Sequence, residues 1–367
     1  MNIFFLAFLH TIGFTQQDLK KIFLENEYYE DFYKSISYDI LVNIFWNKTE
    51  KIKKILSNID KIDTEDILKL IQRLDIVLIS IHDARYPEIL KPLNHSPFFL
   101  YVRWNVDILN TNILAIVWSR KHSPYAKKIL EDFIPILIKE DFTIISGGAY
   151  GIDTLAHEIT IQTKNNGKTL VVFGTGIDRC YPAKNKTLFE DIIKYNWALI
   201  SHFPLGTWPE VYNFPIRNEI VAWMSKGIII PEAWEWSGTL ITAQLWIEHG
   251  RDIFVIPWDI YRESSKGSNS LLTTGQAKCV WNIQDILEEY ILLQHNHMFS
   301  LETKGKHQPF QNSEAEAIYS SIENGYWTVD AIQLETDYST TDILMHLSIL
   351  EIEGHIENDK LWGYYVC

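Results

Sequence analysis

The stretch ILAIVWSRKHSPYAKKIL, residues 113–130, indicates the class of fold. It begins as a β-like run of small apolar residues, passes through a polar turn and continues as a helix-like segment. In a doubly wound α/β fold, such a turn carries glycine, because the backbone there approaches a phosphate at a helix N-terminus. Trp118 ends the run instead. The stretch therefore predicts a strand, a turn and a helix, with an unexpectedly large residue at the turn.

The same alternation continues along residues 111–285. Short β-branched runs recur there, and helix-length stretches separate most of them. Continuous apolar strands that alternate with helices predict a parallel sheet covered on both faces. We therefore expect one α/β domain with a doubly wound, mostly parallel sheet. The expected strands are NILAIV, FTIIS, TLVVF, WALIS, GIIIP and DIFVI, which begin at residues 112, 142, 169, 197, 227 and 252.

The segments on either side of this domain have different patterns. Residues 1–75 are expected to form short helices, and residues 76–110 form a connecting segment with several prolines. The polar stretch 301–312 predicts a linker. Residues 313–367 predict a helix, two further helices and a terminal hairpin, which is the order of a winged helix-turn-helix. The predicted domains are therefore a helical domain at 1–75, the α/β domain at 76–300 and a winged helix at 313–367.

The formal net charge of −14 argues against a protein that binds nucleic acid over its whole surface. The charge is unevenly distributed, because residues 310–367 contain eleven acidic residues and one basic residue. The remaining 309 residues hold 36 acidic and 32 basic residues. The body of the protein is thus nearly neutral and has room for a local basic patch, whereas the acidic tail is a poor candidate for DNA contact.

Cysteine usage and the apolar N-terminus bear on location. The three cysteines lie far apart and form no C-x-x-C pair, so neither a zinc site nor a disulfide framework is predicted. The opening MNIFFLAFLHTIGF lacks a basic leader and is too short to span a bilayer. We expect it to form a buried first helix, and we expect a cytoplasmic protein without membrane segments.

Glycine and hydroxyl residues gather after several expected strands. Exposed backbone N–H groups at helix starts bind phosphate oxygens without any catalytic apparatus. A single loop of this kind is more often only a tight turn. Several of them at the carboxyl ends of neighbouring parallel strands predict one phosphate-binding face. The four loops are 116–120, 144–157, 171–185 and 232–244.

The sequence offers little catalytic machinery. No nucleophile stands at a recognisable spacing from a base, and there is no GxxxxGK[ST] loop. Asp153 and His157 lie one helical turn apart, which favours a structural hydrogen bond between them. We predict no catalytic residue, no metal site and no cofactor.

Seven motifs follow one another along the chain: SR (119–120), SGGAYGIDTLAH (146–157), GTGIDRCYP (174–182), NFPIRNEIVAWMS (213–225), SGTLITAQ (237–244), GRDIFVIP (250–257) and GSNSLLTTGQA (267–277). In order and spacing they resemble the family of DNA-processing protein A (DprA, also called Smf). The resemblance covers about residues 80–285, and it implies an extended Rossmann-like domain. It also implies binding of single-stranded DNA without sequence preference, dimerisation through that domain, and loading of RecA recombinase during natural transformation. The family has no established catalytic turnover.

The resemblance implies a groove in which backbone amides and cations hold phosphates while the bases remain available to a recombinase. The acidic tail would contact a protein or another protomer. The predicted DNA-binding residues are Ser119, Arg120, Lys121, Gly147, Gly148, Lys184, Lys186, Arg217, Asn218, Ser237, Gly238 and Thr239.

Tryptophan occupies several positions where the family pattern has glycine. A Cβ atom and an indole ring clash where φ is positive or where backbones pack closely. We hypothesise that the gene comes from a genome in which UGA encodes glycine, and UGG codons would contradict this. The alternative is that some of these rings stack on bases, with Trp118 as the first candidate. The positions are Trp104, Trp118, Trp197, Trp223 and Trp258.

Other departures lie at the expected DNA face. Tyr150 and Glu219 stand where the family has arginine, and His202 stands where it has glutamate. Loss of two cations would weaken phosphate contact and reduce the salt dependence of binding, although Tyr150 offers stacking in place of charge. Two alternative functions remain: a nucleotide-binding or nucleotide-hydrolysing enzyme of a related Rossmann-like family, and a structural oligomerisation module.

Overall fold

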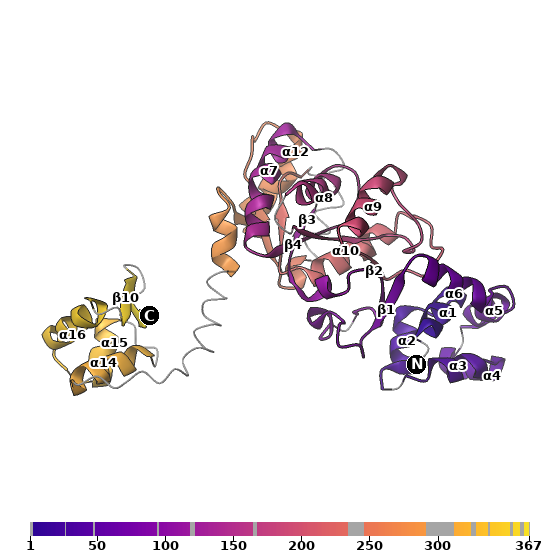
Figure 1. The fold of residues 1–367 in the computed structure, drawn as a ribbon, viewed down its shortest axis with the longest axis horizontal. Coiled ribbons are helices and arrows are strands. Elements are labelled where there is room, and N and C mark those ends of the chain that lie inside the picture. The colour runs from indigo at the N-terminus through magenta and orange to yellow at the C-terminus, as the bar shows by residue number, and fades with distance from the viewer. Residues whose placement is uncertain are drawn as a thin grey trace. The chain divides into compact units, whose positions relative to one another are not determined.

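The computed structural model of the chain contains two compact units, Met1–Glu289 and Tyr290–Cys367 (Figure 1). The expected domain boundaries at residues 75, 300 and 312 stay a prediction. Among the described helices, none is long and apolar enough to cross a membrane. The structure describes residues 3–25, 27–46, 48–93, 95–117, 122–163, 167–233, 246–290, 312–323, 328–336, 338–352, 355–359 and 363–366.

Helices come first in the chain. The first of them, Phe4–Ile12, has seven of its nine residues buried, as its apolar sequence predicted. It contacts the sheet through His10, whose Nδ1 lies 3.1 Å from the hydroxyl of Tyr101. The helices in this region are α1 (Phe4–Ile12), α2 (Gln16–Phe23), α3 (Tyr29–Ser35), α4 (Tyr38–Phe45), α5 (Thr49–Ile59) and α6 (Thr64–Arg73).

A nine-stranded sheet forms the centre of the first unit. Its strands are β1 (Ile76–Ser80), β2 (Phe99–Trp104), β3 (Asn112–Ile116), β4 (Phe142–Ser146), β5 (Lys168–Val172), β6 (Ala198–Ser201), β7 (Gly227–Ile230), β8 (Asp252–Val255) and β9 (Lys278–Cys279). They lie in the order β1-β2-β6-β5-β4-β3-β7-β8-β9. All neighbours from β6 to β9 pair in parallel, whereas β1 and β2 form an antiparallel edge. The expected α/β class with a mostly parallel sheet is confirmed.

Chain connectivity places helices on both faces of the sheet. The connections from β3 to β6 all step in one direction along the sheet, and the connection from β6 to β7 steps back. Because crossovers between parallel strands are right-handed, the helix of the return connection lies on the opposite face. The helical segments of this part are η1 (Glu88–Leu90), η2 (Asp107–Asn110), α7 (Pro124–Lys139), α8 (Ile152–Gln162), η3 (Ala183–Asn185), α9 (Lys186–Lys194), α10 (Asn213–Met224) and α12 (Glu263–Thr273).

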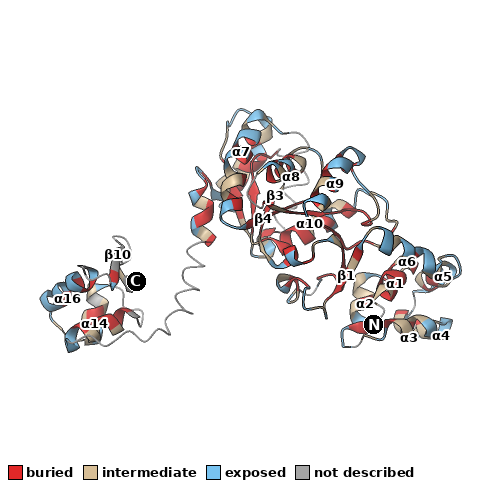
Figure 2. Ribbon diagram, viewed as in Figure 1, coloured by how far each residue is buried: buried red, intermediate tan, exposed pale blue. Residues whose placement is uncertain are grey.

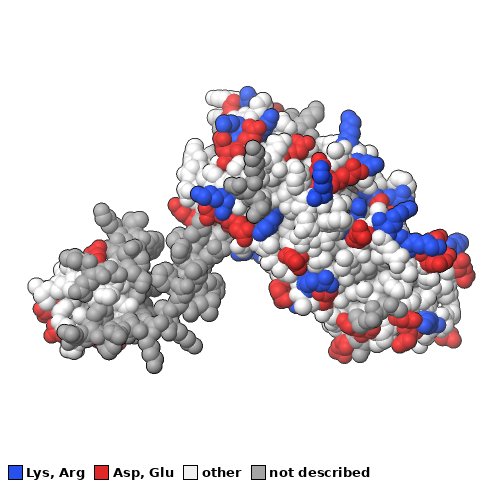
Figure 3. Space-filling model, viewed as in Figure 1, with Lys and Arg blue, Asp and Glu red and all other residues white. Residues whose placement is uncertain are grey.

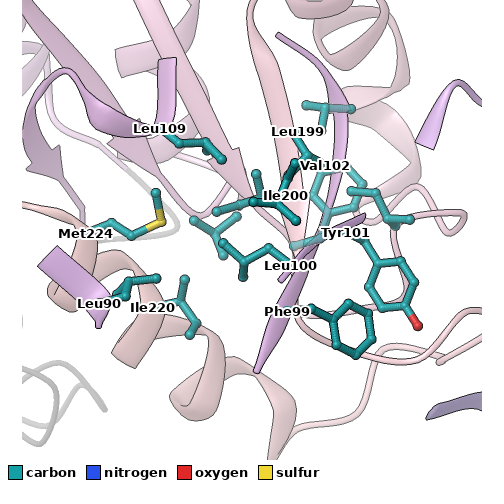
Figure 4. Packing of buried hydrophobic residues seen from close by; sticks show 14 of the residues in the cluster. Leu90, Phe99, Leu100, Tyr101, Val102, Leu109, Leu199, Ile200, Ile220 and Met224 are labelled. Atoms are coloured by element: carbon teal, nitrogen blue, oxygen red, sulfur yellow. The ribbon is translucent and has the colours of Figure 1, made fainter. Parts of the chain in front are cut away.

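The buried core continues from the sheet into α10. Figure 4 shows Leu100 and Val102 of β2 close to Ile200 of β6, with Ile220 and Met224 of α10 on the same side. The strands and α10 are largely buried in Figure 2, whereas the outer sides of α7 and α9 are exposed. This arrangement confirms that the apolar runs of the sequence are central strands.

Two strands come from the proline-containing segment 76–110, where no strand was predicted. β1 and β2 pair over five residues, from Ile76 opposite Arg103 to Ser80 opposite Phe99. The prolines lie in the connection between the two strands, at Pro87, Pro92 and Pro97. They therefore leave the hydrogen bonds of both strands intact.

The second unit has its own core. Its elements are α14 (Ser313–Glu323), α15 (Val329–Thr336), α16 (Thr340–Ile352), β10 (Ile356–Asp359) and β11 (Gly363–Val366). β10 and β11 pair as an antiparallel hairpin. Ile318, Ile332, Ile343 and Leu347 are fully buried between the helices. The order of helices and hairpin agrees with the expected order, and the assignment as a winged helix stays a prediction.

The described tryptophans at expected glycine positions have unequal environments. Trp104 ends β2 with a φ of 80°, in the left-handed region that costs an L-residue about 1–2 kcal/mol. Trp223 is buried in α10, and its indole N–H has no hydrogen-bond partner within the described part of the chain. Trp197 is buried, and Trp258 stacks on Tyr125 with ring centroids 4.6 Å apart. Trp118 lies outside the described residues.

Candidate functional site

The expected binding face lies at the carboxyl-terminal edge of the parallel strands. β4, β5 and β6 are neighbours in the sheet, so the loops that follow them at residues 147–151, 173–182 and 202–212 emerge at the same edge. The structure describes Gly147, Gly148, Lys184, Lys186, Arg217 and Asn218 of the predicted site. The other predicted residues lie outside the described part of the chain: Ser119, Arg120, Lys121, Ser237, Gly238 and Thr239.

Arg217 lies beneath the first of these loops and is only 4% exposed. Its Nη1 donates to the carbonyl of Gly147, directly after β4, and to the carbonyl of Val172, at the end of β5, at 2.6 Å. Its Nε donates to the side-chain oxygen of Asn218 at 3.0 Å. The guanidinium therefore ties the ends of two adjacent strands together and places a buried positive charge under the loop.

The glycine pair after β4 is required by close packing. A Cβ atom on Gly147 would lie 2.3 Å from Cζ of Arg217. A Cβ atom on Gly148 would lie 2.8 Å from a methyl carbon of Val171, and the φ of Gly148 is +66°. Both glycines are buried and both Cβ directions point into the protein, so internal packing against Arg217 and Val171 accounts for the two glycines.

Side chains hold the rest of this loop in place. Asn185 donates to the carbonyl of Gly148 at 3.0 Å and to the hydroxyl of Thr154 at 2.8 Å. The carboxylate of Asp153, in the first turn of α8, accepts from the backbone N–H of Ala149 at 3.2 Å. The loop is thus fixed from both sides before any ligand binds.

His157 has a different partner from the one expected. Its Nδ1 lies 2.7 Å from the hydroxyl of Thr169 on β5, so the hydrogen bond that the structure gives it runs to the sheet and not to Asp153. Burial, and to a smaller extent the nearby charge of Arg217, lower the pKa of His157 to about 3. His202 has its pKa lowered to about 3 by the same two causes, in the same order. Both imidazoles are therefore neutral at physiological pH, and both are buried near the charge of Arg217.

The N-terminus of α7 is already occupied by side chains of the protein. The hydroxyl of Ser123 caps the helix by accepting from the N–H of Ala126 at 3.1 Å. The buried carboxylate of Glu232, which follows β7, accepts from the N–H of Ser123 at 2.8 Å. Glu232 therefore satisfies a helix-start donor that the sequence left available for phosphate.

A family model described as DNA recombination-mediator protein A matches residues 77–291, which is more than half of the chain. The chain belongs to this family. A curated relative, the DNA processing protein DprA of Streptococcus pneumoniae, is 40% identical over 211 residues, which make up 58% of this chain and 73% of the relative. The resemblance inferred from the motifs is confirmed.

Two solved structures of the family are similar to this chain. The X-ray structure of DNA processing protein A from Streptococcus pneumoniae has 34% sequence identity and a TM-score of 0.65, and the match covers 77% of this chain and 96% of that one. The second structure gives insight into the single-stranded DNA binding mode of DNA processing protein A from Helicobacter pylori. It has 29% identity and a TM-score of 0.52, and the match covers 59% of this chain and 96% of that one.

Within this family fold, the two predicted lysines lie beside the Gly147 loop. Lys184 is exposed on η3 and Lys186 is exposed at the start of α9. Asn185, which stands between them, makes the bond to Gly148. Lys186 lies 3.7 Å from the carboxylate of Glu190, one helical turn away, which offsets part of its charge. Figure 3 shows lysine and arginine interspersed with acidic residues on the visible face of the first unit.

The loops after β5 and β6 are joined to each other. The N–H of Gly176 donates to the carbonyl of Thr207 at 3.1 Å, and the N–H of Gly206 donates to the carboxylate of Asp178 at 2.8 Å. Ser201 adds a bond from its hydroxyl to the carbonyl of Thr175 at 2.6 Å. These contacts join the loops after β5 and β6 to each other, at the edge of the sheet that also carries the Gly147 loop.

Exposed tyrosines on this surface were largely missed by sequence reasoning. Tyr150, Tyr181 and Tyr212 are 41%, 43% and 66% exposed, and only Tyr150 was considered for stacking. The signal for the other two was their place after expected strands, where polar loop residues are more usual.

Proposed function

We propose that this protein binds single-stranded DNA without sequence preference and loads a RecA-type recombinase onto it during natural transformation or recombination. The observation that carries the proposal is the fixed loop after β4, which Arg217 supports from within and beside which Lys184 and Lys186 are exposed. Family membership supports the same reading, as does the single-stranded DNA binding mode described for the Helicobacter pylori relative.

Each group has a separate task in this proposal. The lysines neutralise phosphates and provide the salt-dependent part of the affinity. Residues 149–151, which follow the buried glycines and are partly or fully exposed, are proposed to offer backbone groups to the phosphates. Arg217 contributes its charge from below, while its N–H groups hold the strand ends. Ser119, Arg120, Lys121, Ser237, Gly238 and Thr239 are proposed to complete the groove from the loops after β3 and β7.

The remaining parts of the proposal concern the oligomeric state and the cellular location. We propose that the protein acts as a homodimer in the cytoplasm, without a cofactor and without catalytic turnover. The acidic residues of 310–367 fit contact with a protein better than contact with DNA, because they would repel phosphate.

Binding and turnover assays separate this proposal from the nucleotide-handling alternative. We expect the full chain to bind labelled oligo-dT and a mixed-sequence oligonucleotide of equal length with similar affinity. We also expect it to shorten the lag before a RecA-type protein assembles on that DNA. Hydrolysis of any member of a panel of nucleoside monophosphates, together with no oligonucleotide binding, would replace the proposal with the enzyme alternative.

A further inference from the structure

We propose that Tyr150, Tyr181 and Tyr212 form a row on which the bases of the bound strand stack. The inference rests on the proposed function and names the part of the DNA that this edge of the sheet contacts. The phosphates would follow the Gly147 loop and the lysines, and the bases would lie on the tyrosine rings. Aromatic platforms of this kind accept any base, because every base has a π face.

The topology of the sheet places the three tyrosines in sequence along one edge. Tyr150 lies in the loop after β4, Tyr181 in the loop after β5 and Tyr212 in the loop after β6. These strands are immediate neighbours in the order β6-β5-β4, and they run parallel. Their following loops therefore emerge side by side, and the three tyrosines form a row that runs across the ends of β4, β5 and β6.

The three tyrosines are partly exposed and stand on ordered backbone. The ring of Tyr181 packs against Phe214 of α10, with centroids 5.7 Å apart. Tyr212 directly precedes α10, and Tyr150 lies in the loop that Asn185 holds through Gly148. Between 41% and 66% of each residue remains exposed. A ring that is already held, as that of Tyr181 is, loses little freedom when a nucleobase stacks on it, which favours binding.

Cations lie among the tyrosines, and this favours nucleic acid as the occupant over an apolar protein surface. Arg179 is in the same loop as Tyr181, two residues before it, and its side chain is 41% exposed. Lys184 and Lys186 follow Tyr181 within five residues and are exposed. Alternating aromatic and basic residues match the alternating bases and phosphates of a single strand.

The test compares oligo-dT with an abasic oligonucleotide of the same length, which keeps the phosphates and lacks the bases. We expect the wild-type protein to bind oligo-dT on the order of a thousandfold more tightly than the abasic strand, because three stacking contacts of about tenfold each are absent from the abasic complex. Tyr212→Ala and Tyr181→Ala should each weaken oligo-dT binding about tenfold and leave the abasic affinity unchanged. Tyr212→Phe should restore the wild-type affinity, because the ring and not the hydroxyl makes the contact.

A matched control is Tyr195→Ala. Tyr195 is 52% exposed but follows α9 at the opposite, amino-terminal edge of the sheet, so its loss should change neither affinity. Equal binding of both oligonucleotides by the wild type would overturn the tyrosine row and leave the proposed function standing. Binding of neither would overturn both. A change of oligomeric state in Tyr212→Ala, measured by light scattering, with no loss of base preference would assign the row to a protein contact instead.

Discussion

The guanidinium of Arg217 occupies the space that a side chain on Gly147 would need, since a Cβ atom there would lie 2.3 Å from Cζ. The protein's own packing therefore explains the glycine after β4. Arg217 supports the loop from within, and the exposed cations beside it are lysines. The candidate site thus consists of a buried supporting layer and a separate contact surface.

Gly147→Ala should destabilise the protein by about 2–4 kcal/mol, because it displaces a buried arginine from two carbonyl groups. Urea denaturation measures the loss. Gly206→Ala is the comparison, because its φ is +77° but no atom lies within 4 Å of the added Cβ, and it should cost only about 1 kcal/mol. In an Arg217→Ala background, Gly147→Ala should cost clearly less than in the wild type. An equal loss of unfolding free energy in both backgrounds would show that the close contact between residue 147 and Arg217 does not cause the destabilisation.

Stability should fall as the pH is lowered from about 6.5 toward 3. His10, His157 and His202 have their pKa values lowered to about 3, chiefly by burial, whereas the unfolded chain takes up these protons near the ordinary value of 6.5. Each histidine contributes stability that is present above pH 6.5, and the free energy of unfolding decreases by about 1.4 kcal/mol per pH unit per histidine below it.

The measurement is the urea midpoint at pH 7, 6 and 5. His157→Gln should retain a polar contact with Thr169. It should reduce the slope of the unfolding free energy against pH by the contribution of one histidine, about 1.4 kcal/mol per pH unit. A stability that is constant between pH 7 and 5 would contradict the burial of neutral imidazoles.

Trp104→Gly should be more stable than Trp104→Ala by about 1–2 kcal/mol in urea denaturation, because the φ of this residue is 80° and glycine adopts that conformation without strain. The comparison is with alanine because Trp104 is only 42% exposed, so both variants lose the same buried surface. Trp281 is the control position, since it is 80% exposed and is not among the described residues with positive φ; there the glycine variant should be no more stable than the alanine variant.

Trp104 and the four other tryptophans at expected glycine positions test the hypothesis of UGA recoding. We expect mass spectrometry of the protein from its own cells to show glycine at 104, 118, 197, 223 and 258. Among the described residues the indole N–H of Trp223 has no hydrogen-bond partner, which agrees with this expectation. The buried ring of Trp197 and the stacked ring of Trp258 show that the fold also accommodates a large side chain at those two positions. UGG codons at these positions would contradict the hypothesis.

The parallel strands could be predicted because each is a short apolar run buried on both faces, as at FTIIS and GIIIP. The strands β1 and β2 were not predicted, because the three prolines of the connection between them gave the whole segment 76–110 the pattern of a loop. The burial of Arg217 could not be predicted from the sequence either. Its motif NFPIRNEI reads as polar, and its partners Gly147 and Val172 lie 70 and 45 residues away. The resemblance supplied the residue, and only the three-dimensional packing reveals its supporting role.

The most direct test of the central claim is the salt dependence of single-strand binding, measured by fluorescence anisotropy of labelled oligo-dT. The wild type is compared with Lys184→Ala/Lys186→Ala and with Lys34→Ala, whose exposed lysine pairs with Glu30 on α3, away from the site. The wild-type affinity should fall steeply with salt, and the double variant should bind more weakly with a log–log slope reduced by about 1.4, because two phosphate contacts are lost. Lys34→Ala should match the wild type. A wild-type affinity that is independent of salt, or a double variant with an unchanged slope, would contradict the account.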